Sequence, residues 1–532
     1  MRSIIAIFAV LSLIISAVAM ADLSSSDEDV QYFTVGDFTY FILNPSEVEL
    51  ISFDEDSTEE NVIIESSVVN PNDMHAYNIT KVSASFSRDD ISTITIGENV
   101  TDVTYADFSG NGLQAFYVAG GDHFGAVDGV LFKKSGMDNH ILIKYPKGKT
   151  NTSYSTPATI AEIGENAFFG CGNLNTVTLN EGLIKIDYSA FECCYELSNV
   201  RTTAADHSLP TTLSIIGYSA FAYCGKLATL TLPDDLAFIG SSAFEHTGLT
   251  ELNIPYGIEY IGSGAFRDCE SLVKFTSDNY MYKAEETSGV LYKEENNLKT
   301  LFAYPAGAPA ATYQIPEDFG SIATFAFSGC ANLNEVIFNE TCVSIPDMAF
   351  YRCSSLTTIN LDGIITVGIS SFSYCENLSS VNFGSTLTYI DVFAFEDTGL
   401  EYVTIPSSVT YIDTGAFSNC DKLKEFTIPE DSKVTLDSLI FADDWVLKDI
   451  YIESSDVKLL EDSLVITYNE SEKTSVNVHV VKGYSIPDNA SNEFTELNII
   501  IIGERPYPWE NWIGVFFCVL VIIGILWAVR EV

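Results

Sequence analysis

The sequence predicts a repeat solenoid built mainly of β-strands, and three observations support this fold class. A small residue followed by Phe recurs along the middle of the chain, with 22 or 23 residues between successive Phe residues in uninterrupted blocks. Segments of the form Leu-x-x-Val-x-Leu, which alternate like a half-buried strand, follow these anchors. Apolar residues make up 47% of the 532 residues and charged residues 19%, which excludes a disordered chain.

Each anchor sits in one template, Ile-Gly-x-x-Ala-Phe-x-x-Cys-x-x-Leu-x-x-Val-x-Leu-Pro, and a clean copy runs from Ile216 to Pro233. Degenerate copies at Phe108 and Phe441 extend the array. A unit this short cannot bury its own Phe, Ile and Leu, so we expect the units to stack. Their short strands then form a parallel sheet, with turns and short helical pieces on the other side. The anchors are Ala167-Phe168, Ala190-Phe191, Ala220-Phe221, Ala243-Phe244, Ala265-Phe266, Ala326-Phe327, Ala349-Phe350, Ser371-Phe372, Ala394-Phe395 and Ala416-Phe417.

This template resembles the BspA-type leucine-rich repeat of surface proteins from mucosal bacteria and protists, including trichomonad-like surface antigens. The resemblance covers roughly residues 91–452 and implies a leucine-rich repeat solenoid. It also implies adhesion to host cells, to matrix proteins such as fibronectin or to other microbes. Two interruptions, near 117–160 and 276–321, share Gly-Val-Leu-aromatic followed by Tyr-Pro-x-Gly. We expect these islands to be hairpin-like excursions, which are common in that family.

The two ends of the chain predict its location. Residues 1–19 contain one basic residue, then an apolar run, then small residues at the expected cleavage site. This order is typical of a secretory signal peptide. Residues 513–529 are apolar and flanked by Trp, which predicts a transmembrane helix followed by a cytoplasmic tail at 530–532. A lipid-anchor signal is the alternative, although bulky aromatic residues occupy the place of its small-residue site. We expect a single-pass type I protein of the plasma membrane, attached through this one helix.

The regions outside the repeat are expected to cap the solenoid, because the apolar core would otherwise be exposed to water at the two terminal coils. Residues 20–90 predict a strand-rich N-terminal cap, and residues 453–512 predict a strand-rich C-terminal cap with a juxtamembrane segment. The acidic stretch 54–60 is interpreted as a solvated loop. It lacks the Gly of a tight calcium-binding loop.

Glycosylation is expected if the chain is exported, because seven Asn-x-Ser/Thr motifs are present. The acceptors are Asn78, Asn99, Asn151, Asn339, Asn377, Asn469 and Asn489.

The formal net charge of −47 repels phosphate backbones, so we expect no nucleic-acid partner. It also repels anionic lipid head groups.

Cysteine follows the anchor Phe by three residues in eight of its eleven occurrences. One Cys per repeat predicts a ladder of small buried thiols, and disulfides between neighbouring coils remain possible in a secreted chain. No Cys-x-x-Cys is present and no His shares a motif with Cys, so no metal site and no cofactor are expected.

No catalytic motif supports an enzyme: the sequence has no His-Glu-x-x-His, no Gly-x-Ser-x-Gly and no phosphate-binding loop. Gly110-x-Gly112-x-x-Ala115 matches a dinucleotide fingerprint only formally, because it lies in a degenerate repeat with no helix pattern after it. The six His residues are interpreted as surface residues, and a hydrolase hidden in an island or a cap is the least favoured function.

The candidate ligand face is the outward side of the Leu-x-x-Val-x-Leu strands, a long row of short polar groups with a few aromatics. Thr and Asn also simply suit exposed strands, so the whole face is a stronger prediction than any one residue. We expect it to bind an extracellular protein or a host-cell or microbial surface. The alternative is a structural, acidic glycoprotein coat. The face residues are Thr176, Thr178, Thr229, Thr231, Glu251, Asn253, Glu335, Ile337, Thr358, Asn360, Ser380, Asn382, Tyr402, Thr404, Glu425 and Thr427.

Overall fold

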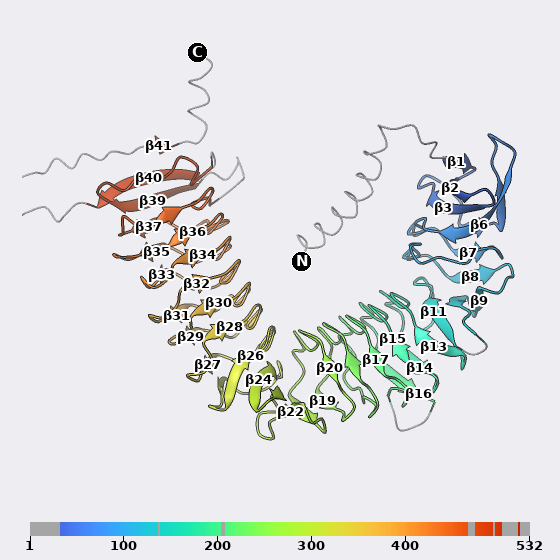
Figure 1. Ribbon diagram of the computed structural model, residues 1–532, viewed down its shortest axis with the longest axis horizontal. Helices are drawn as coiled ribbons and strands as arrows, with labels where there is room; N and C mark the ends of the chain where they lie inside the picture. Colours follow the sequence, from blue (N-terminus) through green and yellow to red (C-terminus); the bar gives the residue numbers. More distant parts are fainter. Residues whose placement is uncertain are drawn as a thin grey trace, which may run out of the picture. The chain divides into compact units, whose positions relative to one another are not determined.

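The computed structural model describes residues 32–136, 139–203, 208–466, 474–492, 495–502 and 520–521. The chain forms two units, residues 1–131 and residues 132–532 (Figure 1). The expected signal peptide at 1–19 lies outside the described residues. So does the expected membrane helix at 513–529, apart from Leu520–Val521.

Unit 1 contains a five-stranded sheet in the order β1-β2-β3-β6-β5 and a parallel sheet in the order β4-β7-β8. Its core holds Phe53, Phe86, Phe108 and Phe116, whose rings follow one another at centroid distances of 5.5, 5.7 and 5.1 Å. Phe108, the anchor of the degenerate first repeat, is therefore a core residue. The strands are β1 (Tyr32–Val35), β2 (Phe38–Asn44), β3 (Glu47–Phe53), β4 (Asn61–Ile64), β5 (Ser67–Val69), β6 (Ala76–Val82), β7 (Thr93–Ile96), β8 (Ala115–Val118) and β9 (Phe124–Val127).

The formal dinucleotide match is explained by packing in unit 1. A Cβ atom on Gly110 would lie 2.6 Å from the carbonyl oxygen of Arg88, and one on Gly112 would lie 1.9 Å from that of Asp89. The two glycines therefore allow neighbouring coils to approach closely. The segment leads into β8, a strand rather than a helix.

Unit 2 is a solenoid in which most coils contribute one strand to each of two columns, and successive coils pair in parallel (Figure 1). Column A holds the Leu-x-x-Val-x-Leu segments, whose inward residues such as Val177 and Leu179 are fully buried. Its strands are β12 (Ser153–Ser155), β14 (Thr176–Leu179), β16 (Asn199–Thr202), β19 (Glu251–Ile254), β21 (Lys274–Ser277), β25 (Thr312–Gln314), β27 (Glu335–Ile337), β29 (Thr358–Asn360), β31 (Ser380–Asn382), β33 (Tyr402–Thr404), β35 (Glu425–Ile428), β37 (Asp449–Ile452), β39 (Thr474–Val481) and β40 (Thr495–Ile502).

Column B consists mostly of two-residue strands, several of which end in the Ile of the Ile-Gly motif, as at Ile216 and Ile239. Its strands are β13 (Ile160–Ile163), β15 (Lys185–Ile186), β17 (Ile215–Ile216), β18 (Phe238–Ile239), β20 (Tyr260–Ile261), β26 (Phe319–Ile322), β28 (Ser344–Ile345), β30 (Thr366–Val367), β32 (Tyr389–Ile390), β34 (Tyr411–Ile412), β36 (Thr435–Leu436) and β38 (Lys458–Leu459).

The remaining strands belong to the islands and to the C-terminal end. The second island forms antiparallel pairs β22–β23 and β23–β24, and β24 then pairs in parallel with β26. Near the C-terminus β41 pairs with β40. These strands are β10 (Val130–Lys133), β11 (His140–Lys144), β22 (Tyr282–Ala284), β23 (Leu291–Glu295), β24 (Leu298–Ala303) and β41 (Leu520–Val521).

The Ala-Phe turns form a third line of contacts along the solenoid. The rings of Phe327, Phe350 and Phe372 stack with centroid distances of 4.8 and 5.1 Å and interplanar angles of 6°. Backbone hydrogen bonds join these turns as well, for example from Phe191 N to Ala220 O at 2.8 Å. Two residues in many turns, such as Ser189 and Cys193, have positive φ, a conformation that these inter-coil bonds stabilise.

The expectation of short helical pieces was wrong: the described residues of both units contain strands and turns and no helix. The positive φ values within each turn prevent a helical run. Within the described part of the chain, none of the elements is an apolar helix of bilayer-spanning length. The predicted repeat solenoid of parallel strands itself is confirmed.

The thiol ladder is also confirmed, since all ten described cysteines are free. Six of the eight ladder Sγ atoms lie against the carbonyl oxygen of the preceding anchor Phe, as Cys353 Sγ does to Phe327 O at 3.0 Å. Thr398 takes the same place where the repeat lacks Cys, and its hydroxyl lies 3.2 Å from Cys420 Sγ. Burial raises the pKa of Cys171 to about 12, which leaves a protonated thiol with little reactivity.

Candidate ligand-binding face

The outward residues of column A line up in rows, because the parallel strands pair in register. Thr176 and Thr178 of β14 lie opposite Asn199 and Arg201 of β16. Further along, Tyr402 lies opposite Glu425, and Glu425 opposite Asp449. Fourteen of the sixteen predicted face residues occupy such strand positions, four of them half-buried and ten exposed.

The prediction of strand positions at Thr229 and Thr231 was wrong. Both side chains are exposed, and Leu230 and Leu232 still point inward, but the segment pairs with neither neighbouring coil. The preceding link, from Phe191 to Phe221, is 30 residues long instead of 22 or 23. Column B nevertheless keeps its register across this link, and Thr250 N of the next coil still donates to Ala228 O at 3.1 Å.

Several face residues were missed by the sequence analysis. Lys274 and Thr276 of β21 follow the template directly and could have been found from its alternation. The rows on β37, β39 and β40 were missed because the Ala-Phe spacing is lost after Phe441. The missed residues are Asn199, Arg201, Lys274, Thr276, Asp449, Tyr451, Asn477, His479 and Asn498.

Cross-coil hydrogen bonds hold several face side chains in place. Asn382 Nδ2 donates to Asn360 Oδ1 at 2.8 Å, and Thr276 Oγ1 donates to Asn253 Oδ1 at 2.9 Å. Side chains that are already fixed lose less conformational entropy when a ligand binds. The face is therefore partly pre-organised.

Asp449 organises the C-terminal part of this face. Its Oδ1 accepts a hydrogen bond from Asn477 Nδ2 at 3.0 Å and lies 2.8 Å from His479 Nε2. Tyr451 stacks on the His479 ring at 4.2 Å. Burial alone would raise the pKa of Asp449, but the hydrogen bonds from His479 and Asn477 outweigh it and lower the pKa. This cluster offers a carboxylate, an imidazole and an aromatic ring to a ligand.

Tyr402 is the most exposed aromatic residue of the face, with 64% of its surface accessible. Lys424 Nζ lies 5.6 Å from the centre of its ring and 2.6 Å from Glu401 Oε2. An exposed ring beside a cation is a common feature of protein-binding surfaces. In the described residues, no group of three or more His, Cys, Asp or Glu side chains could hold a metal ion.

The expected glycosylation sites differ in accessibility. Asn78, Asn151, Asn377 and Asn489 are exposed, Asn99 is half-buried, and Asn469 lies outside the described residues. Asn339 is only 7% exposed, and its Nδ2 donates to the carbonyl oxygens of Pro316 and Phe319 at 2.6 and 2.8 Å. Asn180 makes the same kind of contact to the preceding coil. Asn339 is thus placed to hold two coils together.

We expect the substitution Asn339→Gln to lower the free energy of unfolding by about 1–3 kcal/mol, because the carbonyl oxygens of Pro316 and Phe319 each lose one hydrogen-bond donor. The glycan mass of the secreted protein should not change, because Nδ2 is not free to be modified. Denaturant unfolding and intact mass before and after enzymatic deglycosylation test both points. Asn151→Gln, at an exposed acceptor, is the control that should change mass without changing stability. A glycan lost with Asn339→Gln would contradict this role.

The fold and the face define a class: a leucine-rich repeat solenoid whose column A presents ordered rows of polar side chains to water. The model of the BspA type leucine-rich repeat region, with 6 copies, matches residues 147–273, 201–301, 306–424 and 362–469. These matches cover more than half of the chain. The protein belongs to the BspA-type leucine-rich repeat family.

Three of the similar solved structures are bacterial proteins. A leucine-rich cell surface protein from Faecalibacterium prausnitzii is 23% identical, with 80% of this chain and 95% of that chain covered and a TM-score of 0.41. The pneumococcal vaccine antigen PcpA is 17% identical, with 90% and 100% covered and a TM-score of 0.49. A leucine-rich repeat protein from Bacteroides ovatus is 18% identical, with 88% and 99% covered and a TM-score of 0.35. No curated protein matches this sequence.

Proposed function

We propose that this protein is a non-enzymatic, single-pass cell-surface protein that binds extracellular macromolecules or other cells through the outward face of column A. The observation that supports this role is the register of the parallel strands, which aligns the predicted face residues into rows. Extended solenoid faces built in this way present a large contact area. The expected secretory signal at 1–19 and the expected membrane helix at 513–529 support an extracellular position of this face.

The chemistry of the face favours a protein ligand. Hydroxyl, amide and carboxylate groups alternate with exposed apolar side chains such as Tyr402 and Ile337. Aromatic anchors within polar surroundings are typical of protein interfaces. The formal charge of −47 supports the expectation that nucleic acid is not the partner.

The alternative is that the protein forms a structural coat of the cell surface, and the high negative charge is also compatible with that role. An acidic, glycosylated surface stays soluble and repels its own copies. A coat protein must also be abundant, whereas a protein that binds a ligand need not be.

The first experiment measures binding of labelled residues 20–505, produced through a secretory pathway, to epithelial cells and to a panel of matrix proteins. We expect saturable binding that unlabelled protein competes away. Flat, non-saturable binding at all concentrations would remove the support for the binding role and favour the coat.

A face variant maps the contact. We expect the triple substitution Asn360→Ala, Asn382→Ala and Tyr402→Ala to weaken binding about tenfold or more, because it removes a hydrogen-bonded pair and an aromatic anchor. The readout is the concentration of half-saturation in the same assay.

The matched control lies on column B. Ser344 and Thr366 also form a cross-coil hydrogen bond of 2.8 Å, and Tyr260 is 45% exposed. Replacing these three residues by Ala should leave binding within about twofold of the wild type. Equal losses in both variants would argue against column A as the contact surface.

A further inference from the structure

A cleft of about 950 Å³ opens on unit 1, where β1, β2 and β3 meet the segment that follows β6. Hydroxyl side chains form its floor. Thr34 pairs with Thr39 across β1 and β2, with 3.1 Å between their Oγ1 atoms, and Thr39 pairs with Ser52 across β2 and β3. The floor continues at Ser83 and Ser85. This row crosses the strands and forms a polar trough.

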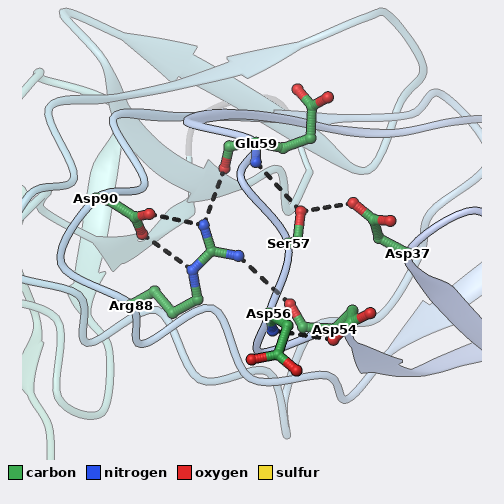
Figure 2. Close-up of polar contacts among 7 residues, drawn as sticks. All are labelled: Asp37, Asp54, Asp56, Ser57, Glu59, Arg88 and Asp90. Atoms are coloured by element: carbon green, nitrogen blue, oxygen red, sulfur yellow. Dashed lines mark hydrogen bonds and ion pairs between the residues drawn. The ribbon is translucent and has the colours of Figure 1, made fainter.

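Arg88 lines the cleft, and its guanidinium group already forms hydrogen bonds within the protein. Figure 2 shows Arg88 facing Asp90, with Nε and Nη2 each 2.9 Å from a carboxylate oxygen. Its remaining N–H groups reach the carbonyl oxygens of Asp54 and Glu59 at 3.4 and 3.5 Å. Arg88 therefore fixes the loop after β3 and contributes no free positive charge.

Three carboxylates around the cleft keep unused acceptor oxygens. Asp37 accepts one hydrogen bond, from Ser57 at 2.5 Å, and Asp54 accepts one, from the backbone N–H of Asp56 at 2.9 Å. The Asp56 side chain is exposed and has no hydrogen bond or ion pair to any described residue (Figure 2). The cleft thus offers lone pairs and negative charge with few free donors.

The spacing of these carboxylates is unsuited to a single metal ion but suits a larger ligand with several positive groups. Among the described residues, no three acidic side chains converge closely enough to hold a metal ion. A cleft of this volume has room for several side chains or for an extended small molecule. Charges spread around such a cleft suit a ligand whose positive groups are also spread.

We propose that this cleft binds ligands that carry several ammonium or guanidinium groups, as basic peptide segments and polyamines do. The ammonium groups lie between Asp37, Asp54 and Asp56, and the hydroxyl floor accepts their remaining N–H groups. Charge-assisted hydrogen bonds of this kind supply both affinity and orientation. This site is independent of the column A face, so either can fail without the other.

The test uses the full chain, purified in mild detergent, with a fluorescent ten-residue lysine peptide as the probe and spermine as the competitor. Because the chain is acidic throughout, the decisive comparison is between variants of equal charge. We expect Asp37→Asn with Asp56→Asn to weaken peptide binding about tenfold. Glu286→Gln with Glu340→Gln, at two exposed acidic positions of unit 2, should change it less than twofold.

Each outcome decides the proposal. Displacement by spermine places the polyamine in the same cleft, and failure to displace assigns the cleft to peptides. Equal weakening in both double variants would mean non-specific attraction and would overturn the site. Tighter binding of calcium or of a neutral oligosaccharide than of the peptide, lost in the Asp37 and Asp56 variant, would also overturn it. Asp56→Asn alone, which breaks no contact among described residues, repeats the test if the double variant does not fold.

Discussion

Replacing Phe350 by Ala is expected to lower the free energy of unfolding by about 3–5 kcal/mol. The ring is fully buried and stacks between Phe327 and Phe372 at 4.8 and 5.1 Å. Its removal leaves a cavity inside a stack that continues on both sides, and the neighbouring rings cannot close it without losing their own coils' hydrogen bonds. Unfolding in urea, followed by far-UV circular dichroism, measures the loss.

The loss should also be local, since each coil contacts only its neighbours. Amide hydrogen exchange is expected to speed up most in the coils anchored by Phe327, Phe350 and Phe372. Tyr402→Ala, at a ring that is 64% exposed, is the control and should change stability by less than about 0.5 kcal/mol. A Phe350→Ala protein within about 1 kcal/mol of the wild type would mean that the stack does not stabilise the solenoid.

The Ala-Phe and Leu-x-x-Val-x-Leu patterns predicted the parts of the fold that depend on burial. Val177 and Leu179 point inward and Thr176 and Thr178 outward, as the period of two requires. The Cys ladder followed from the same reasoning, because a residue that recurs once per coil meets its equivalents in the stack. Repetition made these predictions strong, since ten copies repeat one physical requirement.

Column B could not be predicted from the same pattern. Its strands are often only two residues long, as at Lys185–Ile186, too short for any alternation to show. The Ile of Ile-Gly recurs in the repeat template, but the sequence pattern does not indicate that this residue ends a strand. Turns with positive φ at ordinary residues such as Ser189 and Cys193 are likewise invisible, because inter-coil hydrogen bonds stabilise them rather than residue type.

The candidate face was predicted best where the repeat is regular. Thr358, Asn360, Ser380 and Asn382 lie where the template places them. At Thr229 and Thr231 no strand forms, in the coil that follows an unusually long link, and on β39 the loss of the anchor spacing hid His479. The N-terminal cleft depends on side chains from β1, β3 and the segment after β6, which no short-range pattern connects.

Asp444 provides the second large prediction, because it occupies the ladder position of Cys in the coil anchored by Phe441. The side chain is fully buried, and its Oδ1 accepts a hydrogen bond from Cys420 N at 2.6 Å, whereas Oδ2 has no partner among described residues. Burial raises the pKa of Asp444 well above its usual range. A carboxyl with a raised folded-state pKa contributes stability below the unfolded pKa of about 4, and this is lost as pH rises towards the folded pKa.

Asp444→Cys restores the repeat residue and is expected to raise stability at neutral pH. The advantage over the wild type should grow by about 1.4 kcal/mol for each pH unit above about 4, up to the folded pKa of Asp444. Cys420 N can then donate to the carbonyl of Phe417, as Cys353 N does to Phe350 O at 3.2 Å. Urea unfolding at pH values from 4 to 8 measures the difference.

Asp431 provides a control for the loss of charge alone. It is exposed and has positive φ, a conformation that Asn tolerates, so Asp431→Asn removes one negative charge without relieving any buried group. Its difference from the wild type should stay flat across the same pH range. If Asp444→Cys also gives a flat difference, Asp444 does not titrate with folding, and its burial does not lower the stability of the protein. A rising difference would show that the ladder position selects small, uncharged side chains, which explains why Cys or Thr fills it in the regular coils.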